Sequence, residues 1–556
     1  MDFSPKSGTY YRAFLQNLFF GTLNQEQDKR DWRKEYDKST RKGNRGATNL
    51  WRYKGLLASP DKEKKHEALL RKHIPFVNGG LFDCLDQVFQ EKEGREDIRL
   101  DDFSEEKGNS LCLPNELFFG EEREMDLSVI YDDQRRKREK VRGLVEILSR
   151  YKFTVEENTP LEEEIALDPE LLGKVFENLL ASYNEDTRTT ARKALGAFYT
   201  PREIVSYMVD EALIAYLQNS LTTDYTEAEP EPPKKTSPSL ESASSPVDQK
   251  LRSLSAAHSS HFQNPFSREE TVALIAAIGR VKILDPACGS GAFPMGAPHR
   301  LVDLLQKLDP NNESWKRDRL AEAERYYEML KQANAPKDEL EQCAARMEDI
   351  KKSFASRFHA LDFARKLYLI ENCIYGVDIQ PIATQIAKLR FFIALIVDQN
   401  VDPSAPNLGV RPLPNLETKI VAADTLIPIE KPDRQMDLLD VETRPLRRQL
   451  EQVRHDHFNT RTPSAKARCR QRDAELRAKI SDLLRQNGMP ADEAKALAAW
   501  DPYDQNNAAS FFDPEWMFGV PVGRVKLDAL SSFTLRGNFA LINADRSGPC
   551  QPKACN

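Results

Sequence analysis

Short apolar runs alternate with helical patterns in the second half of the chain. Three such runs, each followed directly by an acidic residue or ending beside one, are residues 281–284, 373–377 and 420–423. Between them, apolar residues recur every three or four positions, as on one face of an amphipathic helix. This alternation predicts an α/β fold with a parallel sheet. In the helix after the second run we expect Ile382, Ile386, Leu389 and Ile393 to form the core face.

Charged helical patterns occupy much of the remaining chain. Residues 1–190 are predicted to form a mostly helical N-terminal region, and about 313–360 and 431–500 read as helical insertions. Residues 441–490 carry 12 Lys and Arg against 6 Asp and Glu. Such an excess is typical of a solvated helical hairpin, with contact to a polyanion as the alternative. His455 and His457 are expected on its surface.

A change of composition separates these parts. Residues 221–265 are rich in Pro, Ser and Glu in their first two thirds, and we predict a disordered linker loop there. It divides a helix over about 191–220 from a core over 266–430, and residues 501–556 form a C-terminal segment. We thus expect several structural units.

Composition narrows the class of protein. The 556 residues have a formal net charge of −7 and are 40% hydrophobic, which suits a globular protein. No stretch approaches the roughly 20 apolar residues that span a bilayer, and the N-terminus lacks the features of a signal peptide. The eight cysteines contain no CxxC pair, which argues against zinc sites and a disulfide framework. A reduced cytoplasmic protein without metal is the expectation.

The first apolar run leads into Asp285-Pro-Ala-Cys-Gly-Ser-Gly291 and then a predicted helix near Phe293. Gly289 and Gly291 permit positive φ and close approach of a ligand, and a helix N-terminus can receive a carboxylate. Asp285 can meet an ammonium group. The third glycine of a dinucleotide fingerprint and the Gly-Lys-Ser/Thr of a P-loop are both absent. The loop therefore suits an amino-acid zwitterion.

This loop resembles motif I of the amino-group DNA methyltransferases, which are Rossmann-like and bind S-adenosylmethionine. Three further stretches resemble motifs of that family. Gly196 to Val205, with Phe-Tyr-Thr-Pro, resembles motif X, Ile374 to Pro381 resembles motif II and Ile420 to Leu426 resembles motif III. The cofactor-binding residues that the resemblance implies are Thr200, Pro201, Asp285, Ala287, Gly289, Gly291, Asp378, Ile379 and Asp424.

The resemblance also implies a role for several of these residues. Thr200 and Pro201 lie against the methionine end of the cofactor in that family, and their own pattern predicts Thr200 as a helix N-cap with Pro201 at the first helical position. Asp378 would accept the ribose hydroxyls and Ile379 would lie against the adenine face. Asp424 would accept a hydrogen bond from the exocyclic amine of adenine.

The order X, I, II, III resembles the γ arrangement of N6-adenine methyltransferases. More closely, the chain resembles the large adenine-specific methylases of type II restriction–modification and phage-exclusion systems. Residues 74–82, 168–180 and 511–519 add to this resemblance, which covers most of residues 1–519. It implies methyl transfer to adenine N6 in double-stranded DNA, and partnership with a restriction endonuclease or other phage-defence proteins.

One expected element is missing. The family holds the target amine with Asn-Pro-Pro-Tyr, and the nearest stretches here are Asn264-Pro-Phe266, Asp501-Pro-Tyr503 and Asn543-Ala-Asp545. Since the family pattern stops near residue 520, we expect a truncated or frameshifted chain without catalytic residues. A non-catalytic remnant that binds cofactor or DNA is the main alternative, and methylation of a protein glutamine or an RNA base is a third.

Overall fold

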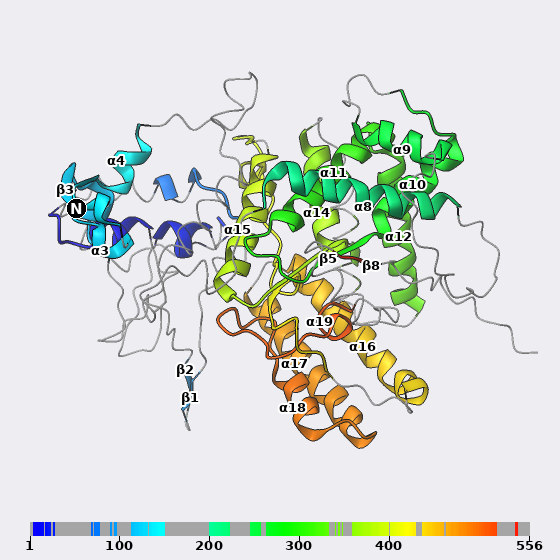
Figure 1. Ribbon diagram of the computed structural model, residues 1–556. Helices are drawn as coiled ribbons and strands as arrows, with labels where there is room; N and C mark the ends of the chain where they lie inside the picture. The colour runs from blue at the N-terminus through cyan, green and yellow to red at the C-terminus, as the bar shows by residue number, and fades with distance from the viewer. Residues whose placement is uncertain are drawn as a thin grey trace, which may run out of the picture. The chain divides into compact units, whose positions relative to one another are not determined.

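The computed structural model describes part of the chain (Figure 1). The described residues are pieces of 4–96, then 113–150, 200–222, 245–256, 263–332, single positions between 340 and 347, 359–429, 436–519 and 540–542, with small gaps at 132, 400 and 461–462. They form two compact units. One comprises residues 1–198, 388–416 and 456–468, and the other comprises the remainder.

A four-stranded sheet lies at the centre of the second unit. Its order is β7 (Ile420–Ala422), β6 (Ile374–Asp378), β5 (Lys282–Asp285) and β8 (Ala540–Ile542). β5, β6 and β7 are parallel, with Ile283 opposite Ile374 and Gly376 opposite Ile420. The three predicted strands and their parallel pairing are therefore confirmed. β8 pairs with β5 in the antiparallel sense.

Helices connect and cover these strands. Those that concern the site are α8 (Arg202–Thr222), α9 (Pro246–Ala256), α10 (Arg268–Arg280), α11 (Ala292–Leu308), α12 (Glu313–Gln332), α14 (His359–Asn372) and α15 (Pro381–Val397). α10 begins with a capping box, because Ser267 and Glu270 satisfy each other's backbone N–H groups. α11 starts close to the predicted position and continues through Pro298.

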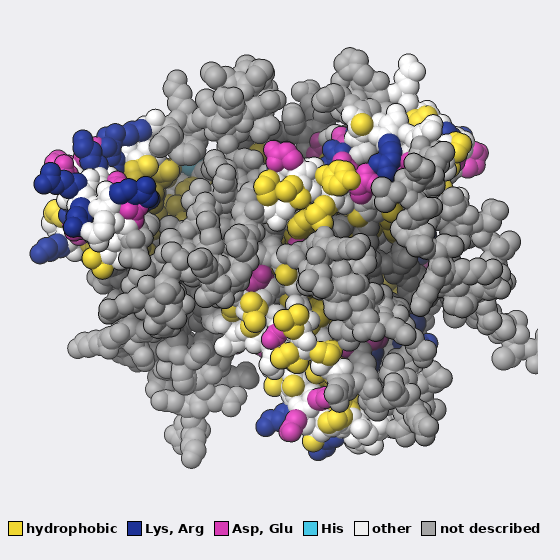
Figure 2. All heavy atoms as spheres, viewed as in Figure 1, with side chains coloured by type: hydrophobic (Ala, Val, Ile, Leu, Met, Phe, Trp, Pro, Cys, Tyr) yellow, Lys and Arg dark blue, Asp and Glu magenta, His cyan; other side chains and the backbone are white. Residues whose placement is uncertain are grey.

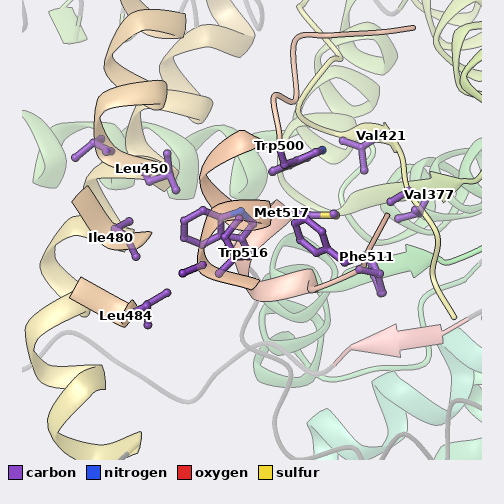
Figure 3. Close-up of a cluster of buried hydrophobic side chains, with 14 of the residues drawn as sticks. Val377, Val421, Leu450, Ile480, Leu484, Trp500, Phe511, Trp516 and Met517 are labelled. Carbon is purple, nitrogen blue, oxygen red and sulfur yellow. The ribbon is translucent and has the colours of Figure 1, made fainter. Parts of the chain in front are cut away.

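The predicted insertion at 431–500 is helical, but it is not a solvated hairpin. It forms α16 (Met436–Asn459), α17 (Pro463–Gln486) and α18 (Ala491–Ala499), followed by α19 (Pro514–Phe518). Leu450, Ile480 and Leu484 from these helices share one buried cluster with Val377 and Val421 of the sheet, as Figure 3 shows. Trp500, Phe511, Trp516 and Met517 fill the space between them. The insertion is thus a covering layer of the sheet.

The two histidines of this region are also not ordinary surface residues, contrary to expectation. His457 is fully buried. His455 is largely covered and lies 3.5 Å from the Glu371 carboxylate. The basic composition hid this burial because part of the positive charge lies inside the protein. Arg454 and Arg477, for example, are both buried and paired with Asp473.

Two other expectations need correction. Within the predicted linker at 221–265, residues 246–256 form α9, which buries Leu251 and Leu254. Arg252 of α9 also forms an ion pair with Glu211 of α8. In α15, Ile386 is buried as predicted, but Ile382 is half exposed. Phe391 and Phe392 are buried as well, so the buried residues of α15 do not form the single Ile–Leu stripe that was expected. An apolar helix with buried residues all round has no unique core face.

The described parts of residues 1–190 are less helical than predicted. They contain the short helices η1 (Tyr11–Leu15), η2 (Asn17–Leu23), α2 (Glu116–Phe119), α3 (Ser128–Tyr131) and α4 (Leu144–Leu148), and the hairpins β1 (Phe89–Glu91)–β2 (Gly94–Glu96) and β3 (Arg123–Met125)–β4 (Glu139–Val141). Residues 168–180 and the Asn78-Gly79-Gly80 turn lie outside the described residues.

Basic side chains gather on the part of this unit that carries β3 and β4 (Figure 2). Acidic neighbours pair with several of them. Glu122 lies within ion-pair distance of Lys140 and Arg142, and Asp133 accepts hydrogen bonds from Arg135. Pairing of this kind weakens the positive electrostatic potential around these basic side chains. In the described part of the chain, no helix combines the length and the apolar character that crossing a membrane requires.

Candidate cofactor site

The loop after β5 is fastened to the carboxyl end of β6. The Cys288 N–H donates to the Val377 carbonyl at 2.8 Å, and the Gly289 N–H donates to Asp378 Oδ2 at 2.9 Å. The Ala287 N–H donates to Asp285 Oδ1 at 3.1 Å. These bonds bring the predicted motif I and motif II residues into one hydrogen-bonded group at the carboxyl edge of the sheet. In open α/β sheets this edge is where ligands bind.

Both glycines of the loop are required by its geometry. Gly289 has φ 54° and Gly291 has φ 88°, a region that side-chain-bearing residues rarely adopt. A Cβ on Gly291 would lie 3.0 Å from the Ala387 Cβ of α15. The loop can therefore keep its shape only with glycine at position 291, which supports the sequence reading of a close backbone turn.

Asp285 is a buried acid with an unused oxygen. The residue is 1% exposed, and its Oδ2 has no hydrogen-bond partner among the described residues. Burial raises the pKa of the carboxyl, the Ala287 hydrogen bond lowers it and the nearby Asp378 carboxylate adds a smaller increase, so that the pKa is about 8. A buried acceptor without a partner is costly, and a cation would relieve that cost. Asp285 thus fits an ammonium group.

Asp378 ends β6 and keeps capacity for further hydrogen bonds. Its Oδ2 accepts from Gly289 and its Oδ1 accepts from the Gln380 N–H at 2.8 Å. Burial raises the pKa of this carboxyl, while the two backbone hydrogen bonds act in the opposite direction. A carboxylate has about four acceptor positions, so two hydroxyl groups can still bind. Next to it, the Ile379 side chain is 58% exposed and offers an apolar surface.

Asp424 lies beside this group, just beyond β7. Ala422 is the register partner of Asp378, and Asp424 follows it by two residues. Its Oδ1 accepts from the Leu426 N–H at 3.0 Å, which holds the turn that follows. Leu426 is 80% exposed and Ile427 is half exposed. Two exposed apolar residues beside an acid at a strand end form a surface on which a flat ring could lie.

The start of α8 reaches the same edge. Val205 of α8 lies against Gly296 of α11, where an added Cβ would be 2.5 Å from Val205 Cγ1. Five residues further along α8, Asp210 forms a 2.7 Å ion pair with Arg300 of α11. The two helices therefore run in parallel, and their N-terminal ends meet. Thr200 and Pro201 precede the start of α8, and from this arrangement we infer that they lie toward the Gly291 turn.

The details of both helix starts differ from the sequence reading. Val205 N–H donates to the Pro201 carbonyl, so Pro201 rather than Thr200 precedes the first helical residue, Arg202. In the loop, the N–H groups of residues 287, 288, 289 and 291 already have protein acceptors. A ligand carboxylate would have to be met by the first turn of α11, in which Pro294 contributes no N–H.

The two described stretches that loosely resemble Asn-Pro-Pro-Tyr, at residues 264–266 and 501–503, are held in other roles. Tyr503 is buried and its hydroxyl donates to Asp473, so it cannot stack on a base. Asn264 accepts from the Phe266 N–H and donates to Thr271, in the approach to α10. β8 is antiparallel to β5, with Ile542 opposite Lys282, so its carboxyl end lies at the opposite edge from Asp285. Residue 543 itself lies outside the described residues.

Sequence reasoning missed one segment at this edge. Residues 501–512 return from α18 and run beside β7, where Ala509 forms a parallel bridge with Ala423. The Gln385 side chain of α15 donates to the Gln505 carbonyl at 3.4 Å. The sequence of this segment has no hydrophobic periodicity that would predict a strand. It pairs with the chain after β7 only through two isolated β-bridges. The Phe511-Phe512 pair was the only signal that it is anchored, and both side chains are buried.

Comparison with known proteins gives one relative and no structural neighbour. A Methanocaldococcus jannaschii protein described as "Putative type II restriction enzyme and methyltransferase" is 26% identical to this chain over 427 residues. The match covers 75% of this chain and 24% of that protein, so the chain spans about a quarter of its relative's length. No protein-family profile matches the chain, and no solved structure matches it. The similarity supports a relationship to restriction–modification methyltransferases.

Within the described residues, no group of three or more His, Cys, Asp or Glu side chains could hold a metal ion. Among the described cysteines, Cys288, Cys343, Cys373 and Cys469 form no disulfide bond. Burial raises the pKa of the Cys373 thiol to about 11, which makes it unreactive at neutral pH. The described residues bring carboxylates, backbone amides and apolar surface to the carboxyl edge.

Proposed function

We propose that the chain is the cofactor-binding part of a site-specific DNA methyltransferase of the restriction–modification type. It would use S-adenosylmethionine and methylate N6 of adenine in double-stranded DNA. The observation that carries the proposal is the hydrogen-bonded group formed by the Asp285 loop and Asp378 at the carboxyl ends of β5 and β6. The similarity to a protein described as a restriction enzyme and methyltransferase supports the same class.

The residues present fit this cofactor in chemical type. Asp285, with its unpartnered buried oxygen, would hold the ammonium of the methionine moiety, with Thr200 and Pro201 beside it. Gly289, Gly291 and Ala287 would let the cofactor approach the backbone. Asp378 would accept the ribose hydroxyls, and Ile379 and Asp424 would contact the adenine. When bound, the sulfonium supplies an electrophilic methyl group, so the protein's task is mainly to position the acceptor amine.

The second candidate is a protein that binds the cofactor or DNA and transfers nothing. The strand that neighbours β5 favours this candidate, because β8 is antiparallel and brings its amino end, not its carboxyl end, to the carboxyl edge of β5. Methylation of a protein glutamine or an RNA base is the third candidate. The sequence contains no Asn-Pro-Pro-Tyr element, which weighs against methyl transfer catalysed by these 556 residues alone.

Methyl transfer from tritiated S-adenosylmethionine distinguishes these candidates. With mixed-sequence duplex DNA, we expect no measurable incorporation by the 556-residue chain, because extraction of the base costs a few kcal/mol and the residues that would hold it are missing. A chain extended after about Gly519 with a family-like continuation should methylate adenine. Incorporation into adenine by the printed chain would show that an acceptor site is present after all. Failure of the extended, folded chain would favour the non-catalytic protein.

A further inference from the structure

The segment that follows α18 connects the helical insertion to the candidate cofactor site. The Ala509 N–H donates to the Ala422 carbonyl and the Asp424 N–H donates to the Ala509 carbonyl, both at 2.9 Å. Three residues later, the Phe512 N–H donates to the Ile427 carbonyl at 2.8 Å. The segment is thus hydrogen-bonded on both sides of the turn that carries Asp424. It forms the outer border of the carboxyl edge beyond β7.

The exposed part of this segment is ordered by Asp504. Asp504 Oδ1 accepts from the Asn506 N–H at 3.0 Å, and its Oδ2 accepts from the Asn507 side-chain amide at 2.8 Å. At its start, the Gln505 carbonyl is held by Gln385 of α15, the helix that begins directly after Asp378 and Ile379. Asn506 and Asn507 are nevertheless exposed. Two amides therefore stand, on a fixed backbone, between the start of α15 and Asp424.

The end of the segment is anchored in the core. Phe511 and Phe512 belong to the buried cluster that joins α16, α17 and α18 to the sheet. Before it, Tyr503 is buried against Asp473 of α17. The position of Asn506 and Asn507 is thus set by the insertion and not by the loop alone. Such support is what a binding residue needs to hold its orientation.

We propose that residues 504–509 form the outer wall of the cofactor's adenine subsite, and that Asn506 and Asn507 recognise the edge of the base. This inference rests on the proposed function, since it needs the adenosine group at this edge. A carboxamide carries a donor and an acceptor side by side and matches the adjacent acceptor and donor on an adenine edge. A carboxylate such as Asp424 can accept hydrogen bonds but cannot donate them. An amide therefore adds the donor that a carboxylate lacks.

Binding of three nucleoside thioethers to the full chain tests this assignment. The first two probes are S-adenosylhomocysteine and its hypoxanthine counterpart, in which a carbonyl oxygen replaces the exocyclic amine. We expect the wild-type chain to prefer the adenine probe and the double variant Asn506→Ala/Asn507→Ala to lose about tenfold or more of that preference. A third probe, the 2′-deoxyribose counterpart of S-adenosylhomocysteine, measures the preference for ribose, which would depend on Asp378 and should not change. Gln486→Ala, an exposed amide on α17, is the matched control and should behave as wild type.

Each result decides the proposal. Both substituted side chains are exposed, so the double variant should fold, which circular dichroism can verify. If it binds the adenine probe with the wild-type preference, the wall does not read the base and the inference is overturned, while the cofactor site stands. If the folded wild-type chain binds none of the probes, the proposed function fails as well. Equal loss of both base and ribose preferences would mean a general disturbance and would also overturn the assignment.

Discussion

Asp473→Ala should lower the free energy of unfolding by about 3–5 kcal/mol, the largest effect on stability that we expect from a single substitution. Asp473 is fully buried and lies 2.8 Å from Arg454 Nε and 2.6 Å from Arg477 Nε. Its removal would leave the buried Arg454 guanidinium without this counter-charge, and Arg477 with only the half-exposed Asp501 carboxylate at 3.7 Å. The two arginines also hold the chain around them, since Arg454 donates to the Trp516 carbonyl and Arg477 to the Ala498 carbonyl.

Denaturant unfolding measures this loss, and the same helix provides the control. Glu475 lies two residues along α17, with its side chain 45% exposed and a 3.3 Å ion pair to Arg472. Exposed pairs of this kind contribute little, so Glu475→Ala should change the free energy of unfolding by less than about 1 kcal/mol. Equal unfolding midpoints for the two variants would show that the buried ion pairs do not hold the insertion against the sheet.

Asp285→Asn should stabilise the chain at neutral and alkaline pH. Burial raises the pKa of Asp285 to about 8, so its carboxyl takes up a proton more readily in the folded than in the unfolded chain. Its contribution to stability is complete below the ordinary pKa of about 4 and is lost as the pH rises through about 8. An amide does not ionise, so the variant should be more stable than wild type by about 2 kcal/mol or more at pH 8.

The measurement is the free energy of unfolding of both proteins from pH 4 to pH 9. The two curves should separate as the pH rises, with the wild type falling more steeply. Asp482→Asn, which alters an exposed carboxylate on α17, should give a curve parallel to that of wild type. If Asp285→Asn also ran parallel to wild type, the burial cost assigned to this carboxyl would be wrong. The same variant should bind the cofactor more weakly, which is the usual conflict between stability and function.

The strand and loop positions at the site were predictable because their signals are local. Each apolar run is short and ends at an acid, and the Gly289 and Gly291 positions mark a turn that the structure confirms with positive φ. Parallel pairing then brings Asp285, Asp378 and Asp424 to one edge without further information. That these three residues bind the cofactor remains a prediction.

The burial of the insertion could not be predicted in the same way, because it depends on pairs of residues that are far apart in the sequence. Composition counts Arg454 and Asp473 as surface charge, but these two residues, 19 positions apart in sequence, neutralise each other between α16 and α17. The bridge between Ala509 and Ala423 joins positions that no periodicity links. Long-range pairing of this kind also explains why the contribution of residues 501–512 to the site edge was not expected.

Calorimetric titration of the folded 556-residue chain with S-adenosylmethionine tests the central claim most directly. We predict saturable binding that Asp378→Ala weakens by about 1–3 kcal/mol, since the ribose hydroxyls lose their acceptor. Asp318→Ala, which removes a partly exposed carboxylate on α12, should leave binding unchanged. Thermal unfolding of each variant verifies that it is folded. The absence of binding by folded wild-type protein, or unchanged affinity in Asp378→Ala, would contradict the assignment of the carboxyl edge as the cofactor site.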